Sequence, residues 1–143
     1  MAQSSTAKKE EDAIKVAWLG GLRLQAEARG HRIVVDQPQE DGGEDKGMTP
    51  VELFVASLGT CIGFYAVRFC QRHGLSSEGL QVRMSWDYAE QPHRIGVMSA
   101  KVDLREKLDT AMKDRLQKVL EGCTVQNSIS MSPKISVQIG ERS

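Results

Sequence analysis

One segment limits what this chain can fold into more than any other. From Leu53 to Val67 the sequence has no charged residue, and Thr49-Pro50-Val51-Glu52 stands just before it. A threonine cap, a proline at the first helical position and a glutamate three residues after the cap form a strong helix start. Gly74 is placed to end the helix. The sequence therefore predicts a helix over about residues 50–73, roughly 36 Å long at 1.5 Å per residue.

The first four turns of this predicted helix are apolar or small nearly all the way round. A helix with that pattern must be buried on every side, and a single sheet covers only one side. In a chain of 143 residues, a second copy of the same chain is a natural cover for the rest. The uncharged run is shorter than the roughly 18 to 20 residues that span a bilayer, so we expect no membrane span.

Alternating apolar and polar residues on both sides of the helix predict strands. Two or three short strands precede it, a strand pair follows, and then come an amphipathic helix capped by Gly122 and a last strand. The segments that carry these patterns are Val16–Trp18, Leu22–Ala28, Ile33–Val35, Val82–Tyr88, Met98–Leu104, residues 108–121 and Ile135–Ile139. This order predicts an α+β fold with a mainly antiparallel sheet and the helices packed on one face.

Two polar segments set the expected domain limits and a loop. Residues 1–12 are polar, and we expect a disordered tail there, followed by a single domain over residues 13–143. Pro38 to Met48 is acidic and glycine-rich. We interpret it as a solvated connection, with a flap over a pocket as the alternative.

Composition excludes several classes of function. Lysine plus arginine and aspartate plus glutamate both number 19, so the net charge is zero, which argues against nucleic-acid binding by bulk electrostatics. The N-terminus has no apolar core and is not a signal peptide. Three cysteines are too few, and odd in number, for a secreted disulfide scaffold. We expect a cytoplasmic protein whose cysteines start as thiols.

The cysteines are the candidate functional residues. Cys61 lies in the middle of the apolar helix, and Cys70, nine residues later, falls about 180° round it. Cys123 continues the apolar stripe of the second helix, so Cys61 and Cys123 can approach each other if both helices pack on the same sheet. The alternative is that they are small buried hydrophobic residues, and we expect that role for Cys70.

No other pattern in the sequence indicates a prosthetic group. No cysteine or histidine pair has zinc spacing, and there is no Cys-x-x-Cys. No glycine-rich phosphate loop or dinucleotide fingerprint is present. We therefore expect neither a metal nor a cofactor.

Two segments resemble a known family. Residues 49–61, Thr-Pro-Val-Glu-Leu-Phe-Val-Ala-Ser-Leu-Gly-Thr-Cys, are similar to the central-helix signature of the OsmC/Ohr family, the osmotically inducible and organic hydroperoxide resistance proteins. Residues 119–128, Val-Leu-Glu-Gly-Cys-Thr-Val-Gln-Asn-Ser, resemble its second cysteine segment, with an asparagine four residues after the cysteine. The resemblance covers residue 14 to about residue 140. It implies an intertwined homodimer with the long helices at its centre.

The resemblance also implies thiol-dependent reduction of organic or hydrogen peroxides in oxidative stress defence. Cys61 would be the peroxidatic thiol, which becomes a sulfenic acid, and Cys123 the resolving thiol, which forms a disulfide with it. An external dithiol, in this family often a lipoylated protein, would restore the pair. No nucleic acid or membrane partner is implied.

The activating residues of the family match this sequence less well. A peroxidatic thiol needs a nearby cation, which in the family is an arginine of the first hairpin, held by a glutamate ten residues before the first cysteine. Val51 stands at that glutamate position, and the neighbouring Glu52 is explained by the helix cap. Arg29 is the nearest match for the arginine, with Arg23 and Arg32 as alternatives. This departure resembles the OsmC-like branch, and it keeps a second hypothesis open: a catalytically weak OsmC-like dimer that acts as a ligand-binding or redox-sensing protein.

Overall fold

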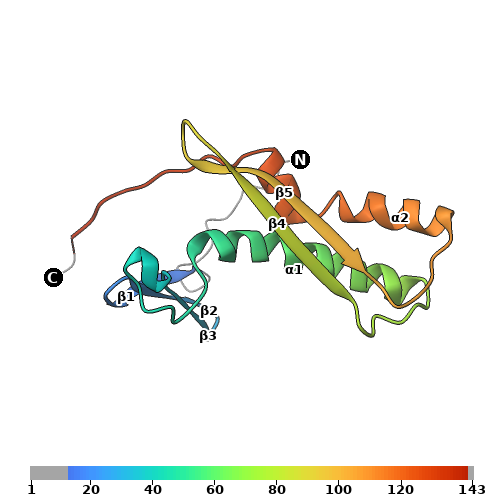
Figure 1. Ribbon diagram of the computed structural model, residues 1–143, viewed down its shortest axis with the longest axis horizontal. Coiled ribbons are helices and arrows are strands. Elements are labelled where there is room, and N and C mark those ends of the chain that lie inside the picture. Colours follow the sequence, from blue (N-terminus) through green and yellow to red (C-terminus); the bar gives the residue numbers. More distant parts are fainter. Residues whose placement is uncertain (1–12, 142–143) are drawn as a thin grey trace, which may run out of the picture. The chain divides into compact units, whose positions relative to one another are not determined.

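A computed structural model describes residues 13–141 (Figure 1). The predicted disordered tail, residues 1–12, lies outside the described residues. The chain divides into two compact units, Met1–Phe54 and Val55–Ser143. The expectation of one domain over residues 13–143 stays a prediction.

The first unit contains a three-stranded antiparallel sheet in the order β1-β2-β3. Its strands are β1 (Lys15–Gly20), β2 (Arg23–Ala28) and β3 (His31–Val35), which confirms the strands predicted before the helix. A two-residue turn, Arg29-Gly30, joins β2 to β3, with φ of 50° and 81°. Both values are positive, as the tightest hairpin turns require.

The loop after β3 is organised around a buried carboxylate. Asp36 is 1% exposed, and its oxygens accept the backbone N–H groups of Gln37, Glu44 and Lys46 at 2.8, 3.2 and 3.1 Å. Burial raises the pKa of this carboxyl, but the three hydrogen bonds and the charge of Arg23 outweigh it, so the pKa lies below its usual value. The carboxylate therefore stays charged and holds the loop.

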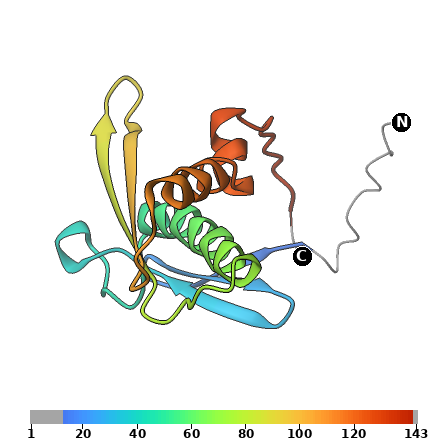
Figure 2. The same cartoon turned by 90° about the vertical axis from the view of Figure 1, so that its right-hand side faces the viewer.

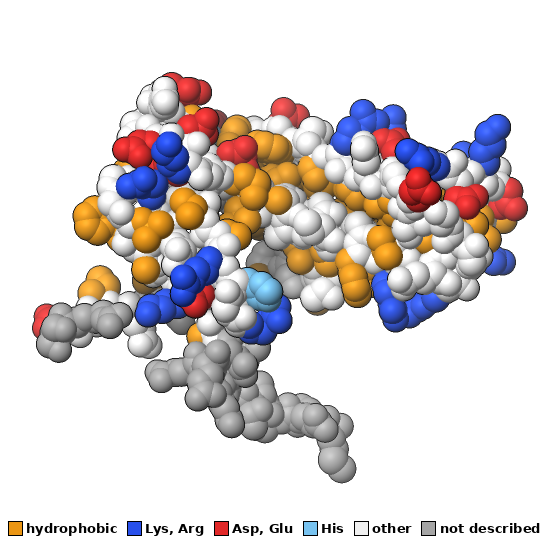
Figure 3. Space-filling view, turned by 90° about the horizontal axis from the view of Figure 1, so that it is seen from below, with side chains coloured by type: hydrophobic (Ala, Val, Ile, Leu, Met, Phe, Trp, Pro, Cys, Tyr) orange, Lys and Arg blue, Asp and Glu red, His pale blue; other side chains and the backbone are white. Residues whose placement is uncertain are grey.

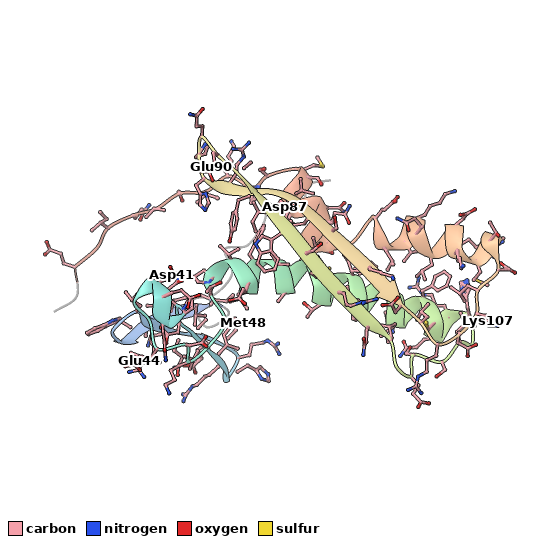
Figure 4. The ribbon with its side chains drawn as sticks, viewed as in Figure 1. Asp41, Glu44, Met48, Asp87, Glu90 and Lys107 are labelled. Carbon is pink, nitrogen blue, oxygen red and sulfur yellow. The ribbon has the colours of Figure 1, made fainter. Side chains whose placement is uncertain are left out.

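Most residues of the segment 38–48 are exposed, as a solvated connection requires, and Asp36 anchors it from within. The loop includes a short 3₁₀ helix, η2 (Gln39–Asp41), and Figure 4 labels Asp41, Glu44 and Met48 along it. Gly43 and Gly47 have no room for a side chain, because an added Cβ would collide with the backbone carbonyls of Gln37 and Val34. The glycines of this segment therefore serve close backbone packing.

Helix α1 (Pro50–Arg72) confirms the long helix that the sequence predicts. Its start is the expected capping box: the Thr49 N–H donates to Glu52 Oε1 at 3.0 Å, and the Glu52 N–H donates to Thr49 Oγ1 at 3.1 Å. At the other end Gly74 adopts a left-handed φ of 64°, and the Leu75 N–H donates to the Cys70 carbonyl.

The second unit builds its core on the remainder of α1 (Figure 2). Strands β4 (Gln81–Ala89) and β5 (Arg94–Asp103) form an antiparallel hairpin on one side of the helix, and α2 (Thr110–Leu120) lies along it. Core residues come from α1, from α2 and from the segment after α2: Leu58, Ile62, Ala66, Phe69, Leu116, Leu120 and Cys123. Small residues let β4 approach α1, since a Cβ added at Gly59 would lie 2.8 Å from Met84 Cγ.

Two sequence predictions about the second unit are wrong in detail. Helix α2 begins at Thr110 rather than at residue 108, because the Asp109 side chain caps it by accepting the Met112 N–H at 2.8 Å. A helix that was not predicted, α3 (Thr124–Ser130), follows it. Gly122 stands in the link between the two helices, and the cap residue of α2 is Glu121.

The predicted last strand is not formed, and the expected mainly antiparallel sheet is divided into two separate sheets. Residues 132–141 carry no regular structure, and Ile135, Val137 and Ile139 are 85%, 86% and 98% exposed. Alternating apolar and polar residues favour an extended backbone, but they do not determine whether a neighbouring strand pairs with the segment. Among the described residues no strand offers this segment a ladder of hydrogen bonds.

Helix α1 is long and apolar enough, by length and composition, to cross a membrane. However, Val55, Leu58, Ile62, Ala66 and Phe69 on this helix are buried inside the protein. A core helix passes the same composition test, so no membrane span is implied.

Candidate active site

The structure brings Cys61 and Cys123 together and leaves both as free thiols. Cys61 lies on α1 and is partly exposed, whereas Cys123 is 0% exposed. Cys61 packs against the core cluster that contains Cys123, and its thiol is close enough to raise the pKa of Cys123. The apolar stripe of α2 predicted that Cys123 points inward and can approach Cys61, and in the structure Cys123 is buried beside Cys61.

The environment of Cys123 keeps its thiol protonated. Burial raises its pKa, and the neighbouring Cys61 thiol raises it further, while the backbone N–H groups of Gln126 and Val125 act in the opposite direction. The net effect places the pKa of Cys123 above that of an ordinary thiol, which is about 8.5. At neutral pH Cys123 is thus a thiol rather than a thiolate.

Cys123 is also the cap of α3. Its Sγ accepts the Gln126 N–H at 3.4 Å in the place where a serine or aspartate oxygen usually stands. The Asn127 side chain donates to the Gly122 carbonyl at 3.3 Å and so fixes the backbone just before the cysteine. The asparagine that the sequence singled out therefore supports the position of Cys123.

A tyrosine joins the two helices beside the thiols. Tyr65 follows Cys61 by one turn of α1, and its hydroxyl lies 3.2 Å from Thr124 Oγ1. Thr124 is the residue after Cys123, so this hydrogen bond ties α1 to the start of α3. Sequence reasoning did not identify Tyr65, although a tyrosine four residues after a candidate cysteine on a helix shares its face.

Cys70 is not part of the pair. It is fully buried on α1, nine residues after Cys61, which corresponds to about 13.5 Å along the helix axis. The structure therefore agrees with the structural role expected for this cysteine.

The residues considered for activating Cys61 all lie in the first unit. Glu52 is engaged in the capping box, as expected, and Val51 stands at the position where the resemblance implies a glutamate. Arg23 Nη1 lies 3.2 Å from Glu44 Oε2, and Arg32 Nε lies 3.4 Å from Glu27 Oε2, while Arg29 stands in the β2–β3 turn. Within the described residues, no hydrogen bond or ion pair joins the Cys61 thiol to a cation.

A cavity of about 800 Å³ with a mixed polar and apolar lining lies between α1, the β4–β5 hairpin and α2. Leu58 and Ile62, which flank Cys61 on α1, line it together with Met84, Met98 and Leu120. Five charged residues also line it, namely Asp103, Glu106, Lys107, Lys113 and Glu121. Lys107 is labelled in Figure 4 at the connection between β5 and α2. The volume of the cavity is in the range of small-molecule sites, roughly 300–1,000 Å³. In the part of the chain that is described, no group of three or more metal-binding side chains is present.

The chain combines an α+β fold with a long core helix that carries Cys61 beside Cys123. Residues 43–138 match the family model described as OsmC-like protein, and the chain belongs to this family. A comparison with curated protein sequences finds no match.

Solved structures of family members share the fold. An osmotic stress induced and detoxification response protein from Psychrobacter arcticus is 20% identical, with a TM-score of 0.75 over 80% of this chain and 85% of that one. An OsmC like protein from Mycoplasma pneumoniae is 13% identical, with a TM-score of 0.72 over 87% and 91% of the two chains. The organic hydroperoxide resistance protein OsmC from Legionella pneumophila is 19% identical, with a TM-score of 0.61 over 82% and 88%.

Proposed function

We propose that this protein is a thiol-dependent peroxidase that reduces organic or hydrogen peroxides through Cys61 and Cys123. The single observation that carries the proposal is the contact between these two thiols in the core of the second unit. Membership of the OsmC-like family supports a peroxide-related role. The names of the Legionella pneumophila and Vibrio cholerae neighbours, both organic hydroperoxide resistance proteins, point to the same chemistry.

The reaction divides into three balanced steps. The Cys61 thiolate attacks the terminal peroxide oxygen, the O–O bond breaks, and the leaving oxygen takes a proton to form an alcohol or water. The Cys123 thiol then attacks the sulfenic sulfur of Cys61, and water leaves as the disulfide forms. An external dithiol, for which a lipoylated protein is our candidate, returns two electrons and two protons to the pair.

The surroundings of the two thiols favour this assignment of roles. Cys61 is partly exposed, so a peroxide can reach it, whereas Cys123 is fully buried. The raised pKa of Cys123 keeps it from competing for peroxide as a thiolate. A resolving thiol needs only to lie within reach of the sulfenic acid, and the thiol–thiol contact supports that reach.

The proposal includes a cytoplasmic homodimer. Large apolar side chains remain on the surface of the chain (Figure 3). Phe54 on α1 is 42% exposed and Trp18 on β1 is 71% exposed, and the extended residues 135–139 alternate exposed apolar side chains with polar ones. A second copy that covers these surfaces would satisfy the burial that the apolar helix requires. Light scattering should give about twice 15.8 kDa; a stable monomer would contradict this part of the proposal.

The central experiment is a steady-state assay with an organic hydroperoxide and a small dithiol. We expect the wild-type protein to consume peroxide and dithiol in equal amounts. Mild oxidation followed by non-reducing peptide mapping should then show a bridge between Cys61 and Cys123. The Cys70→Ser variant should form the same bridge. A bridge to Cys70 in the wild-type protein would contradict the assignment of Cys61 and Cys123 as the reactive pair.

A second candidate function is a catalytically weak dimer that binds a ligand or senses redox state. Two points favour it: Val51 stands where the resemblance places a glutamate, and a cavity of about 800 Å³ adjoins the cysteine helix. This function predicts disulfide formation without sustained turnover. A single round of oxidation at any dithiol concentration would favour it over the peroxidase.

A further inference from the structure

A second hollow lies in the same unit, between α1 and α2, and the peroxidase proposal does not use it. This groove has a volume of about 570 Å³. Aromatic side chains and cationic side chains make up most of its lining, which comprises Phe64, Tyr65, Arg68, Phe69, Arg72, His73, Arg115, Lys118 and Val119. We refer to it as the basic groove.

The charge of the basic groove is one-sided. Four permanent positive charges come from Arg68 and Arg72 on α1 and from Arg115 and Lys118 on α2, and no carboxylate of the described residues lines the groove. Within residues 13–141, none of the four forms an ion pair. By contrast, Arg23, Arg32, Arg83 and Arg105 each have a carboxylate partner at 2.7 to 3.4 Å. In a chain of zero net charge, this is a local excess that a bound anion would neutralise.

Helix ends account for only half of these charges. A cation in the last turn of a helix is favoured by the helix dipole, which explains Arg72 on α1 and Lys118 on α2. Arg68 and Arg115 stand earlier in their helices and receive little of that benefit, because the effect falls off within one turn. Arg68 donates a hydrogen bond to Gln71 Oε1 at 3.5 Å, but that amide carries no charge. Like charges that line one hollow repel one another, most strongly within the Debye length of about 8–10 Å.

The floor of the basic groove is aromatic. Phe69 is buried, and the His73 ring stacks on it with centroids 4.2 Å apart and an interplanar angle of 16°. Phe64 is exposed and meets Tyr65 edge to face at 5.7 Å. Phe64, Arg68 and Arg72 recur at four-residue spacing and so lie along one side of α1. Flat apolar surface therefore lies directly beside guanidinium groups.

We propose that the basic groove binds a small organic anion that has an aromatic or apolar body and a carboxylate, sulfonate or phosphate head. Concave positive surfaces raise the local concentration of anions, and guanidinium groups hold such heads with two parallel hydrogen bonds. The body of the ligand would cover Phe64 and the Phe69–His73 stack. The groove is large enough for one such molecule, since small-molecule sites measure roughly 300–1,000 Å³.

The test uses the full chain and the fluorescent probe 1-anilinonaphthalene-8-sulfonate. The double variant Arg115→Gln/Lys118→Gln removes the cations of α2, and Lys113→Gln is the matched control, because Lys113 is an exposed cation of the same helix outside the groove. We expect the double variant to weaken binding about tenfold and the control to change it less than twofold. The uncharged analogue N-phenyl-1-naphthylamine should bind weakly to all three proteins.

Added salt should weaken sulfonate binding to the wild-type protein and affect the double variant much less. Equal binding of the sulfonate to the wild type and the double variant would overturn the proposal. The probe would then bind in the cavity of about 800 Å³ between α1, the β4–β5 hairpin and α2. Loss of the dimer in the double variant, with no probe bound to the wild type, would also overturn it and assign the groove to a second copy of the chain. Peroxide turnover is measured on the same variants and should not change. Probe binding therefore tests the groove and turnover tests the peroxidase proposal, and either proposal can fail without the other.

Discussion

Helix α1 carries one cysteine at its centre and one near its C-terminal end, and the surroundings of the two thiols differ in two respects that matter for chemistry. Cys70, near the end, is fully buried in the core, as the structural role of a cysteine requires. Cys61, at the centre, is partly exposed and lies beside a second thiol, Cys123. Burial alone makes a cysteine an inert apolar residue, whereas access from solvent and a facing thiol make redox chemistry possible.

The largest expected effect comes from removing the central cysteine of the helix and not the one near its end. Cys61→Ser should abolish peroxide consumption in the steady-state assay, because a hydroxyl of normal pKa does not attack the peroxide bond. Cys70→Ser should keep the wild-type rate at a moderate cost in stability, about 1–2 kcal/mol, since a polar hydroxyl enters the core. Thermal unfolding measures that cost. If peroxide consumption is lost in Cys70→Ser but kept in Cys61→Ser, Cys70 and not Cys61 is the reactive cysteine of α1.

The next effect separates the two thiols of the pair. Cys123→Ser should leave one round of reaction intact and stop turnover, because the sulfenic acid on Cys61 then has no thiol partner. A dimedone-type reagent followed by mass spectrometry should label Cys61 in this variant. The wild-type protein, treated in the same way, is the control and should form the disulfide instead. Labelling of Cys123 in the Cys61→Ser variant, with peroxide still consumed, would exchange the two roles.

These expectations depend on elements that the sequence predicts to different degrees. The capping box at Thr49 and Glu52 and the inward direction of Cys123 follow from short-range patterns, since caps and helical stripes depend on residues three or four apart. Helix α3 has no such signal, because its cap is the thiol of Cys123 and not one of the usual oxygen side chains.

Two other features could not be predicted because they depend on partners distant in sequence. The loop around Asp36 is fixed by backbone N–H groups as far away as Lys46, and no side-chain pattern records such bonds. The segment Ile135–Ile139 has the alternation of a strand, but a strand also needs a neighbour, and the described chain gives it none. The same limit applies to the basic groove, which combines residues of two helices more than 40 positions apart.

The pH dependence of alkylation tests the electrostatic part of the comparison. The pKa of Cys123 is raised, so its thiolate forms only at a pH above that of an ordinary thiol, about 8.5. We expect the rate of iodoacetamide labelling at Cys123, followed by mass spectrometry, to rise with a midpoint above that pH. In Cys61→Ala the midpoint should fall, because the neighbouring thiol is one cause of the raised pKa.

The same shift has a consequence for stability with a defined sign. A thiol whose pKa is higher in the folded state binds its proton more tightly there, so it contributes most below the unfolded pKa and progressively less as the pH rises through it. The free energy of unfolding of the wild type relative to Cys123→Ala should therefore decline above about pH 8.5. A relative stability that increases with pH in this window would contradict the raised pKa.

The smallest expected effect concerns the tyrosine that ties the two helices together. Tyr65→Phe keeps the ring and removes the hydroxyl that lies 3.2 Å from Thr124 Oγ1, at a cost of about 0.5–1.5 kcal/mol for a single neutral hydrogen bond. Because Thr124 adjoins Cys123, the start of α3 should become less fixed, and disulfide formation after a peroxide pulse should slow a few-fold in stopped-flow measurements. Tyr88→Phe is the matched control: Tyr88 is the only other tyrosine, and its ring stacks on His93 from the surface of β4. Equal effects of the two substitutions would show that the Tyr65 hydroxyl does not position Cys123, and the contact between the thiols would then depend on the core packing of α1 against α2 alone.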